Sequence, residues 1–153
     1  MNYELTNDQI TLQQRYREFC IKEILPVAEK LDTGSREDAA GLLKKNFLSL
    51  GTLGFLGLGH NPEYGGRETD IITRIIAGEE IAKACAATYI SAITSSVYFG
   101  YILNTFGTEE QKKKYLPEII LGKKIGTLAV TEYESGSDNN EMKTTAFFKG
   151  SAW

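Results

Sequence analysis

The chain has 153 residues, 42% of them hydrophobic and 24% charged, which is the composition of a folded domain long enough to bury a sizeable core. Its net charge of -3 argues against a general attraction to nucleic acid or to anionic membranes. Its two cysteines, Cys20 and Cys85, fit neither a disulfide framework nor a zinc-binding spacing, and the first residues lack the basic and apolar regions of a signal peptide, so we expect a cytoplasmic protein.

The first two predicted helices cover residues 6–31 and 36–50, where apolar residues recur at helical spacing. Local signals mark their ends and one interruption: Thr6 with Gln9 as a capping box, Pro26 as a kink or break, and Ser35 as the second N-cap.

A glycine-rich run follows at residues 51–59 and superficially looks like a phosphate-binding loop. No lysine follows the glycines and no strand precedes them, so we interpret the run as backbone that packs closely against neighbouring helices. His60, the only histidine, follows this run without a visible partner that would orient it as a base, so we expect no catalytic role for it.

A third helix is predicted over residues 70–85, and its most acidic point is the pair Glu79 and Glu80. Paired carboxylates can perform acid-base chemistry, but adjacent positions on a helix point in different directions. We therefore interpret the two glutamates as a solvated or capping pair.

Residues 84–106 carry no charge and are long enough on paper to span a bilayer. They contain too many polar side chains for a helix that faces lipid: Thr88, Ser91, Thr94, Ser95, Ser96, Asn104 and Thr105. The sequence therefore predicts a fourth helix, over residues 87–104, that is buried inside protein and does not enter a membrane. Its aromatic residues either line a pocket or fill a core, and a core is the more common outcome: Tyr89, Tyr98, Phe99, Tyr101 and Phe106.

Gly107 ends this helix, and Thr108 with Gln111 fits a capping box for a fifth helix that closes at Gly122. Residues 112–114 are three lysines on its predicted outer face. Without interleaved aromatic residues, they indicate a solvated surface and not a nucleic-acid site.

The pattern changes from helical to strand-like at residues 125–130, and hydroxyls, carboxylates and glycine follow within a few residues. A second strand is predicted over residues 143–153. The intervening loop is either an ordinary turn or a polar loop delivered to a ligand, where Gly136 would let the backbone approach a bound group and three hydroxyls would hydrogen-bond it: Thr131, Ser135 and Ser137.

Several short segments occur in one order along the chain: Glu23-Ile24-Leu25-Pro26, Leu53-Gly54-Phe55-Leu56-Gly57-Leu58, Pro62-Glu63-Tyr64-Gly65-Gly66, Glu79-Glu80-Ile81-Ala82, Phe106-Gly107-Thr108-Glu109-Glu110-Gln111-Lys112, Gly122-Lys123-Lys124-Ile125-Gly126, Val130-Thr131-Glu132 with Gly136-Ser137-Asp138, and Lys143-Thr144-Thr145-Ala146. Each segment alone is a weak signal. Together, in this order and spacing, they make essentially the whole chain resemble the acyl-CoA dehydrogenase family.

This resemblance implies a mainly α chain: an N-terminal helical domain, residues 1–124, followed by the first strands of a truncated middle β-domain, residues 125–153. Members of the family hold FAD and oxidise an acyl-CoA thioester to the trans-2-enoyl-CoA. A glutamate removes the α-proton while a hydride passes from the β-carbon to the flavin. The resemblance also implies an electron-transfer flavoprotein as partner of the full-length parent, and a homo-oligomer.

Carried over by position, the family's flavin-contacting residues are Leu128, Val130, Thr131, Gly136 and Ser137, and Ser137 would also meet the acyl-CoA. The family usually has proline after Thr-Glu, whereas Tyr133 stands there in this chain, followed by the negative charge of Glu134. The family's catalytic glutamate lies in a region that matches no part of this sequence, so we assign no catalytic residue.

Two classes of function follow from the sequence. The first is a flavin-dependent acyl-CoA dehydrogenase, present here as an N-terminal fragment that is inactive alone. The second is a non-catalytic helical interaction module, or a subunit that a partner chain completes.

Overall fold

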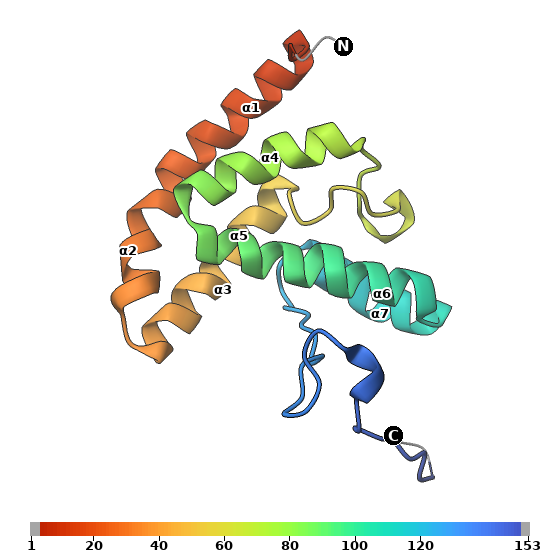
Figure 1. Ribbon diagram of the computed structural model, residues 1–153. Helices are drawn as coiled ribbons and strands as arrows, with labels where there is room; N and C mark the ends of the chain where they lie inside the picture. The colour runs from red at the N-terminus through yellow and green to blue at the C-terminus, as the bar shows by residue number, and fades with distance from the viewer. Residues whose placement is uncertain (1–3, 151–153) are drawn as a thin grey trace.

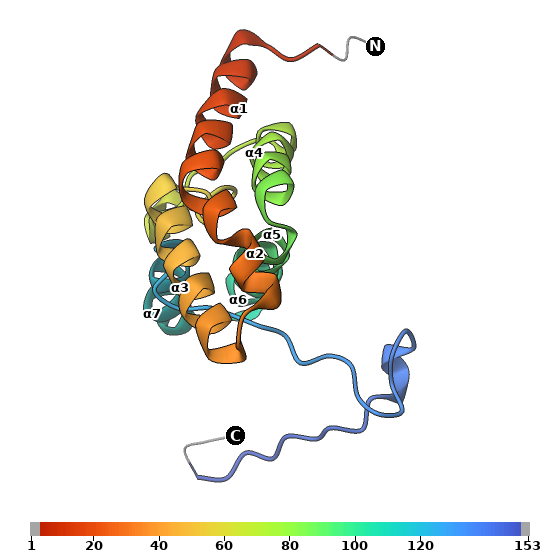
Figure 2. The ribbon, with the colours of Figure 1, turned by 90° about the vertical axis from the view of Figure 1, so that its left-hand side faces the viewer.

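The computed structural model describes residues 4–150, and helices account for most of this range up to residue 120 (Figure 1). The first helical stretch consists of α1 (Asn7–Phe19), the π-helical turn η1 (Cys20–Ile24) and α2 (Leu25–Thr33). Thr6 and Gln9 form the predicted capping box. The predicted interruption is confirmed: Leu25 N–H bonds to the Cys20 carbonyl, one residue further back than in an α-helix, immediately before Pro26, which has no N–H to donate. Figure 2 shows the change of direction between α1 and α2.

Helix α3 (Arg36–Leu53) begins at the predicted cap, where Ser35 Oγ accepts the Asp38 N–H at 3.1 Å. The helix ends three residues later than predicted, because Gly51 continues it and Gly54 closes it in the left-handed region at φ 89°. A Cβ on Gly51 would overlap the backbone of Leu121, and one on Gly57 would lie 3.1 Å from Ile120. The glycine-rich run therefore packs against a neighbouring helix, as predicted.

The loop after α3 contains the short 3-10 helix η2 (Pro62–Tyr64) and leads into α4 (Ile71–Ala84), which Asp70 caps. One continuous helix then spans Ala86–Phe106. It is composed of α5 (Ala86–Ile93), the π-helical η3 (Thr94–Phe99) and α6 (Gly100–Phe106). Helix α7 (Glu109–Ile120) begins at the predicted capping box of Thr108 and Gln111.

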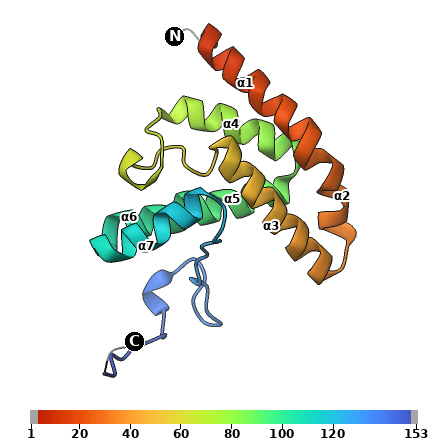
Figure 3. The same cartoon turned by 180° about the vertical axis from the view of Figure 1, so that it is seen from behind.

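The main core lies where α1 packs on α4, and where α3 packs on α2 and α5 (Figure 3). Its completely buried members come from η1, α3, α4, α5 and the loop after α3: Ile24, Phe47, Leu50, Leu56, Ala77, Ile81 and Ala92. A smaller cluster of Tyr64, Leu116 and Ile120 attaches α7 to η2. The core therefore holds α4 and α5 in fixed positions relative to the loop after α3.

The predicted opening strands are not present within residues 4–150. Residues 123–138 run without regular structure, the short 3-10 helix η4 (Asn139–Glu141) follows, and residues 142–148 are extended but form no ladder. A strand forms only where a second strand pairs with it, and within residues 4–150 no strand lies beside residues 123–147. Figure 2 shows this part of the chain running away from the helices. The last three residues of the predicted second strand lie outside the described residues. The proposed division at residue 124 stays a prediction.

The predicted burial of the fourth helix is only partly correct. Just 28% of its most apolar stretch of 18 residues is buried. By length and composition alone, the helix Ala86–Phe106 could cross a membrane. Apolar side chains along it are exposed: Ile90 (59%), Tyr98 (53%), Tyr101 (64%) and Phe106 (78%). The prediction failed because helical periodicity indicates which face is apolar but not whether another element covers it.

Candidate functional site

The segment that carries the predicted site residues leaves α7 and passes beside η3. Gly126 N–H donates to Ser95 Oγ at 2.9 Å, and a Cβ on Gly126 would overlap the Phe99 ring. Ser95 is completely buried, so this contact is a fixed point. The apolar start of the segment is thereby anchored to the helices, and the polar residues follow beyond the anchor.

All five predicted cofactor-binding residues lie on this segment or its loop. Leu128 is half-buried, whereas Val130, Thr131, Gly136 and Ser137 are exposed. Within residues 4–150 the hydroxyls of Thr131 and Ser137 make no hydrogen bond, and a Cβ on Gly136 would meet nothing within 4 Å. The side chains that the sequence singled out are therefore free to receive a ligand, but the described chain does not enclose one.

Ser135, the third hydroxyl of the predicted loop, belongs to the turn itself. Its side chain is 1% exposed and its Oγ donates to the Asp138 carbonyl at 2.9 Å. The Glu132 N–H donates to the Ser135 carbonyl at 2.8 Å and closes the turn. The ordinary-turn interpretation therefore holds for Ser135, because its hydroxyl stabilises the loop and is not accessible to solvent.

Glu132 holds the loop against the chain that follows it. One carboxylate oxygen accepts the Lys143 N–H at 2.8 Å, and the other accepts the Thr144 N–H at 3.0 Å. The pKa of Glu132 is lowered first by the Thr144 side chain and then by these two amide bonds. The sequence interpretation missed this role. The signal was present, because Thr-Glu and Lys-Thr-Thr both belong to the segments that carry the family resemblance.

The two residues that depart from the family pattern, Tyr133 and Glu134, take no part in the bonds between Glu132 and the amides of Lys143 and Thr144. Tyr133 is fully exposed, and Glu134 forms an ion pair with Lys143. The negative charge that Glu134 adds to the loop is therefore accompanied by a positive one.

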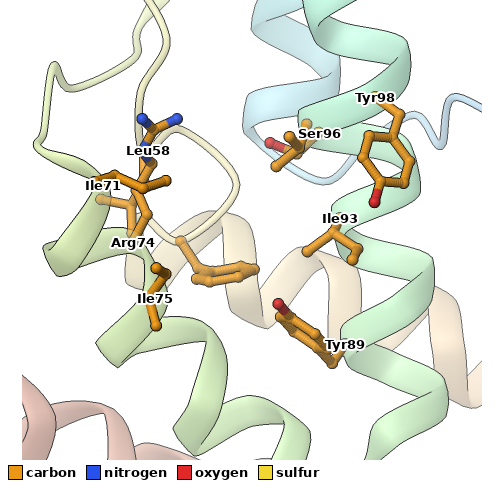
Figure 4. Close-up of a pocket in the computed structure, with 10 residues that line it drawn as sticks. Leu58, Ile71, Arg74, Ile75, Tyr89, Ile93, Ser96 and Tyr98 are labelled. Carbon is orange, nitrogen blue, oxygen red and sulfur yellow. The ribbon is translucent and has the colours of Figure 1, made fainter.

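A cavity of about 200 Å³ lies between α4 and the α5–η3 helix (Figure 4). Its walls are mainly apolar and include Leu58, Ile71, Ile75, Tyr89, Ile93 and Val97. Figure 4 places Arg74 on the α4 side and Ser96 and Tyr98 on the opposite side. Tyr89 and Tyr98 line this cavity, and Tyr89 also packs against the main core. Phe99 and Phe106 line a second pocket beside α7. Tyr101 and Phe106 are exposed, so the core interpretation is wrong for these two.

His60 is a buried structural residue. Its Nε2 lies 3.0 Å from the Ser96 carbonyl and 3.2 Å from Ser96 Oγ, which itself donates to the Leu56 carbonyl at 2.6 Å. Since that hydroxyl proton is already used, Nε2–H is the donor toward Ser96. Burial lowers the pKa of His60, so the neutral ring is favoured. That His60 has no catalytic role stays a prediction.

Glu80 corrects the prediction of a solvated pair. Its carboxylate is 3% exposed and accepts two bonds from Arg17, at 3.0 and 3.1 Å, and one from Lys83 at 2.8 Å. The bond from Arg17 is the largest cause that lowers the pKa of Glu80. Glu79 is exposed, as predicted. The pattern of one helix could not show that Arg17 would meet Glu80 across the α1–α4 interface.

Comparison with known proteins places these features in a family. The family described as acyl-CoA dehydrogenase, N-terminal domain, matches residues 6–123. The short-chain specific acyl-CoA dehydrogenase of Clostridium acetobutylicum is 34% identical over 150 residues, which is 98% of this chain and 38% of that protein. The chain thus spans well under half the length of this relative.

Two solved structures have the same fold over almost the whole chain. The acyl-CoA dehydrogenase complexed with FAD from Bacillus anthracis gives a TM-score of 0.78 at 31% identity, with 92% of this chain and 23% of that chain covered. A structure described as the electron transferring flavoprotein of Acidaminococcus fermentans gives a TM-score of 0.82 at 33% identity, covering 98% of this chain and 38% of that chain.

Proposed function

Because the chain belongs to the acyl-CoA dehydrogenase family, we propose that it contributes the N-terminal domain and the first cofactor contacts of a FAD-dependent enzyme that dehydrogenates an acyl-CoA thioester between its α- and β-carbons. The observation that carries this proposal is the family match over residues 6–123, which continues in the relatives through the predicted site segment. The chain spans only 38% of the Clostridium relative, so the activity is proposed for a complete enzyme and not for these 153 residues alone.

Residues 126–138, the site segment, offer hydrogen-bond donors that a flavin can use. Thr131 and Ser137 offer hydroxyls that are not otherwise hydrogen-bonded within the described residues, and the backbone N–H groups of Leu128 and Val130 donate to no other backbone group there. Such groups can hydrogen-bond flavin carbonyls and phosphate oxygens. We assign Leu128, Val130, Thr131, Gly136 and Ser137 to FAD, and Ser137 also to the acyl-CoA.

In this reaction FAD, when bound, supplies the hydride acceptor. The chain's own contribution is to orient it: Gly126 anchors the segment on Ser95, and Glu132 fixes the loop that carries Gly136 and Ser137. A base must also reach the α-proton of the substrate. Glu80 and Glu132 are both held as ionised acceptors by other groups of the chain, so neither suits this role, and no catalytic base is assigned.

For the partners of the complete enzyme we propose an acyl-CoA substrate and an electron-transfer flavoprotein as acceptor, in a cytoplasmic homo-oligomer without membrane attachment. The likeness to a chain in the electron transferring flavoprotein structure supports the second of these. The alternative, a helical interaction module without catalysis, is supported by the exposed apolar face of Ala86–Phe106.

The test is a titration of the purified 153-residue chain with FAD, followed by amide NMR and flavin absorbance. We expect weak binding, with shifts confined to residues 126–138 and little flavin retained after desalting, because one segment cannot enclose the whole cofactor. The paired change Thr131→Val and Ser137→Ala should abolish the shifts, whereas Thr52→Val, on the outer side of α3, should not.

Absence of any shift in residues 126–138 would contradict the cofactor assignment. A dye-linked assay with an acyl-CoA and added FAD should show no turnover by the chain alone. Turnover would mean that one of its own glutamates serves as the base.

A further inference from the structure

The cavity between α4 and the α5–η3 helix contains one charged group, Arg74, in walls that are mainly apolar. Arg74 projects from α4 into its lining, and Figure 4 shows the guanidinium near Leu58, across the cavity from Ser96. Its Nε is buried and has no hydrogen-bond partner within residues 4–150. Arg74 also forms no ion pair with any described residue. Arg74 as a whole is partly buried, so its guanidinium combines a buried Nε, without a partner in the described residues, with the capacity to receive an anion.

The chain packs closely around this cation, yet no Asp or Glu of the described residues lines the cavity. Gly59 has φ +84°, and a Cβ there would lie 2.8 Å from Arg74 Nη1, so the guanidinium packs on bare backbone. The positive charge of Arg74 also contributes to lowering the pKa of His60. By contrast, the buried charge of Glu80 has two cations bound to it. Arg74 is therefore the unpaired charge of the two.

We propose that this cavity binds the carboxylate end of a small acid with a short apolar body, with Arg74 as the counter-ion. The guanidinium presents planar donors that match a carboxylate, and the side chains of Ile71, Ile75 and Ile93 would cover the apolar part. The volume of about 200 Å³ sets the size, since an apolar cavity of about 150 Å³ accommodates a ligand of six carbon atoms. The ligand therefore has about six to eight non-hydrogen atoms.

Such a carboxylate has two sources. One is a free short-chain acid. The other is the far end of an acyl thioester that carries a second carboxylate, and this source rests on the function proposed above. The chemistry at Arg74 is the same in both, so the experiment uses one probe for each source.

The test titrates the 153-residue chain with hexanoate and with hexanamide, its neutral counterpart, and follows the amide and methyl NMR signals of the cavity. We expect hexanoate to bind at least tenfold more tightly than hexanamide. Arg74→Met should remove this difference while binding of hexanamide persists. Arg36→Met removes the same charge from an exposed position at the start of α3 and should leave the difference unchanged.

Arg74→Lys keeps the charge but loses the planar fork, so it should retain a preference for hexanoate that is weaker than in the unchanged chain. Each variant is first shown to keep the helical circular dichroism of the parent. Equal affinities for hexanoate and hexanamide in the unchanged chain, or an undiminished preference in Arg74→Met, would overturn the proposal.

The second arm compares the pantetheine thioesters of adipic and hexanoic acids, which differ in the far carboxylate. Tighter binding of the adipoyl thioester, lost in Arg74→Met, would assign the carboxylate to an acyl thioester. If only free hexanoate shows the Arg74-dependent preference, the ligand is a free acid, and the proposed function is unaffected because that function rests on residues 126–138. If neither carboxylate is preferred, the cavity is not an anion site.

Discussion

At the residue scale, the direction in which a side chain leaves its helix decides what it does. Glu79 and Glu80 are neighbours on α4 with the same chemistry, yet Glu79 is exposed whereas Glu80 is 3% exposed and bound to Arg17 and Lys83. Both cations are more than half exposed, so they reach inward from solvent to meet the buried carboxylate. Glu80 therefore connects α1 to α4 and takes no part in the candidate site.

Replacing each of the two glutamates by alanine separates the two environments. Glu80→Ala should lower the free energy of unfolding by about 1–3 kcal/mol, because it removes charge-assisted hydrogen bonds at a buried position. Glu79→Ala, as the matched control, should change it by no more than about 0.5 kcal/mol. Urea denaturation measures both. Similar costs for the two variants would show that Glu80 does not hold the α1–α4 interface.

His60 makes folding stability depend on pH with a definite sign. Burial lowers the folded pKa of His60 below its ordinary value of 6.5, so the unfolded chain takes up a proton first as the pH falls. Its contribution is fully present above 6.5 and is lost as the pH falls from 6.5 through the lowered folded value. His60→Gln, which keeps a donor toward Ser96 but does not titrate, should lose less stability than the parent between about pH 7.5 and about pH 5.5.

Urea midpoints at the two pH values provide the measurement, and the difference between parent and variant isolates His60 because the chain has no other histidine. An identical loss in both proteins would mean that His60 is protonated equally easily in the folded and unfolded states.

At the element scale, glycines decide how closely α3 and α7 approach. Gly51 lies inside α3, where glycine is unfavourable, yet a Cβ there would overlap the backbone at Leu121. Gly122, at φ 69°, likewise has no room for a Cβ beside Phe47. The end of α7 therefore packs directly against the backbone of α3. The segment that carries the predicted site residues begins immediately after this contact.

Two glycines of the same helix give opposite expectations. Gly51→Ala should destabilise the chain by about 1–3 kcal/mol, since the new methyl group must separate α3 from the end of α7. Gly41→Ala meets nothing within 4 Å and should stabilise by about 0.5–1 kcal/mol through the better helix propensity of alanine. The midpoint of thermal unfolding of the two variants is the measurement. A Gly51→Ala variant that is more stable than the parent would rule out the close approach of α3 to the end of α7.

At the scale of the whole molecule, the described chain exposes an apolar face on Ala86–Phe106 and leaves an extended segment without a sheet. Tyr101 and Phe106 are 64% and 78% exposed, and Phe147 near the other end of the chain is 77% exposed. Apolar surface of this kind favours contact with another surface.

We therefore expect the 153-residue chain to form dimers or larger assemblies at micromolar concentration, as sedimentation velocity would show. The paired change Tyr101→Lys and Phe106→Lys should shift the distribution toward monomer, whereas Ile10→Lys, an exposed apolar residue of α1, should not. A single monomer boundary for the unchanged chain across that concentration range would contradict this expectation.

The sequence by itself determined the features whose causes are local. Local residues, within one or two helical turns, cause the caps at Thr6, Ser35 and Thr108 and the interruption before Pro26. These features could therefore be predicted from the sequence alone. The family resemblance was equally accessible, because it rests on short segments in a fixed order. The segment that carries Thr131 and Ser137 was likewise identified, although its assignment to FAD stays a prediction.

Only the tertiary structure decided the features that depend on residues far apart in sequence. Arg17 meets Glu80 across 63 positions, Glu132 binds the amides of residues 11 and 12 positions later, and Arg74 shares a cavity with the η3 helix. The absence of the predicted strands within residues 4–150 has the same origin, since a strand exists only where a second one pairs with it. Local propensity indicates which secondary structure a segment prefers. Burial, ion pairing and sheet formation depend on which segments the fold places in contact.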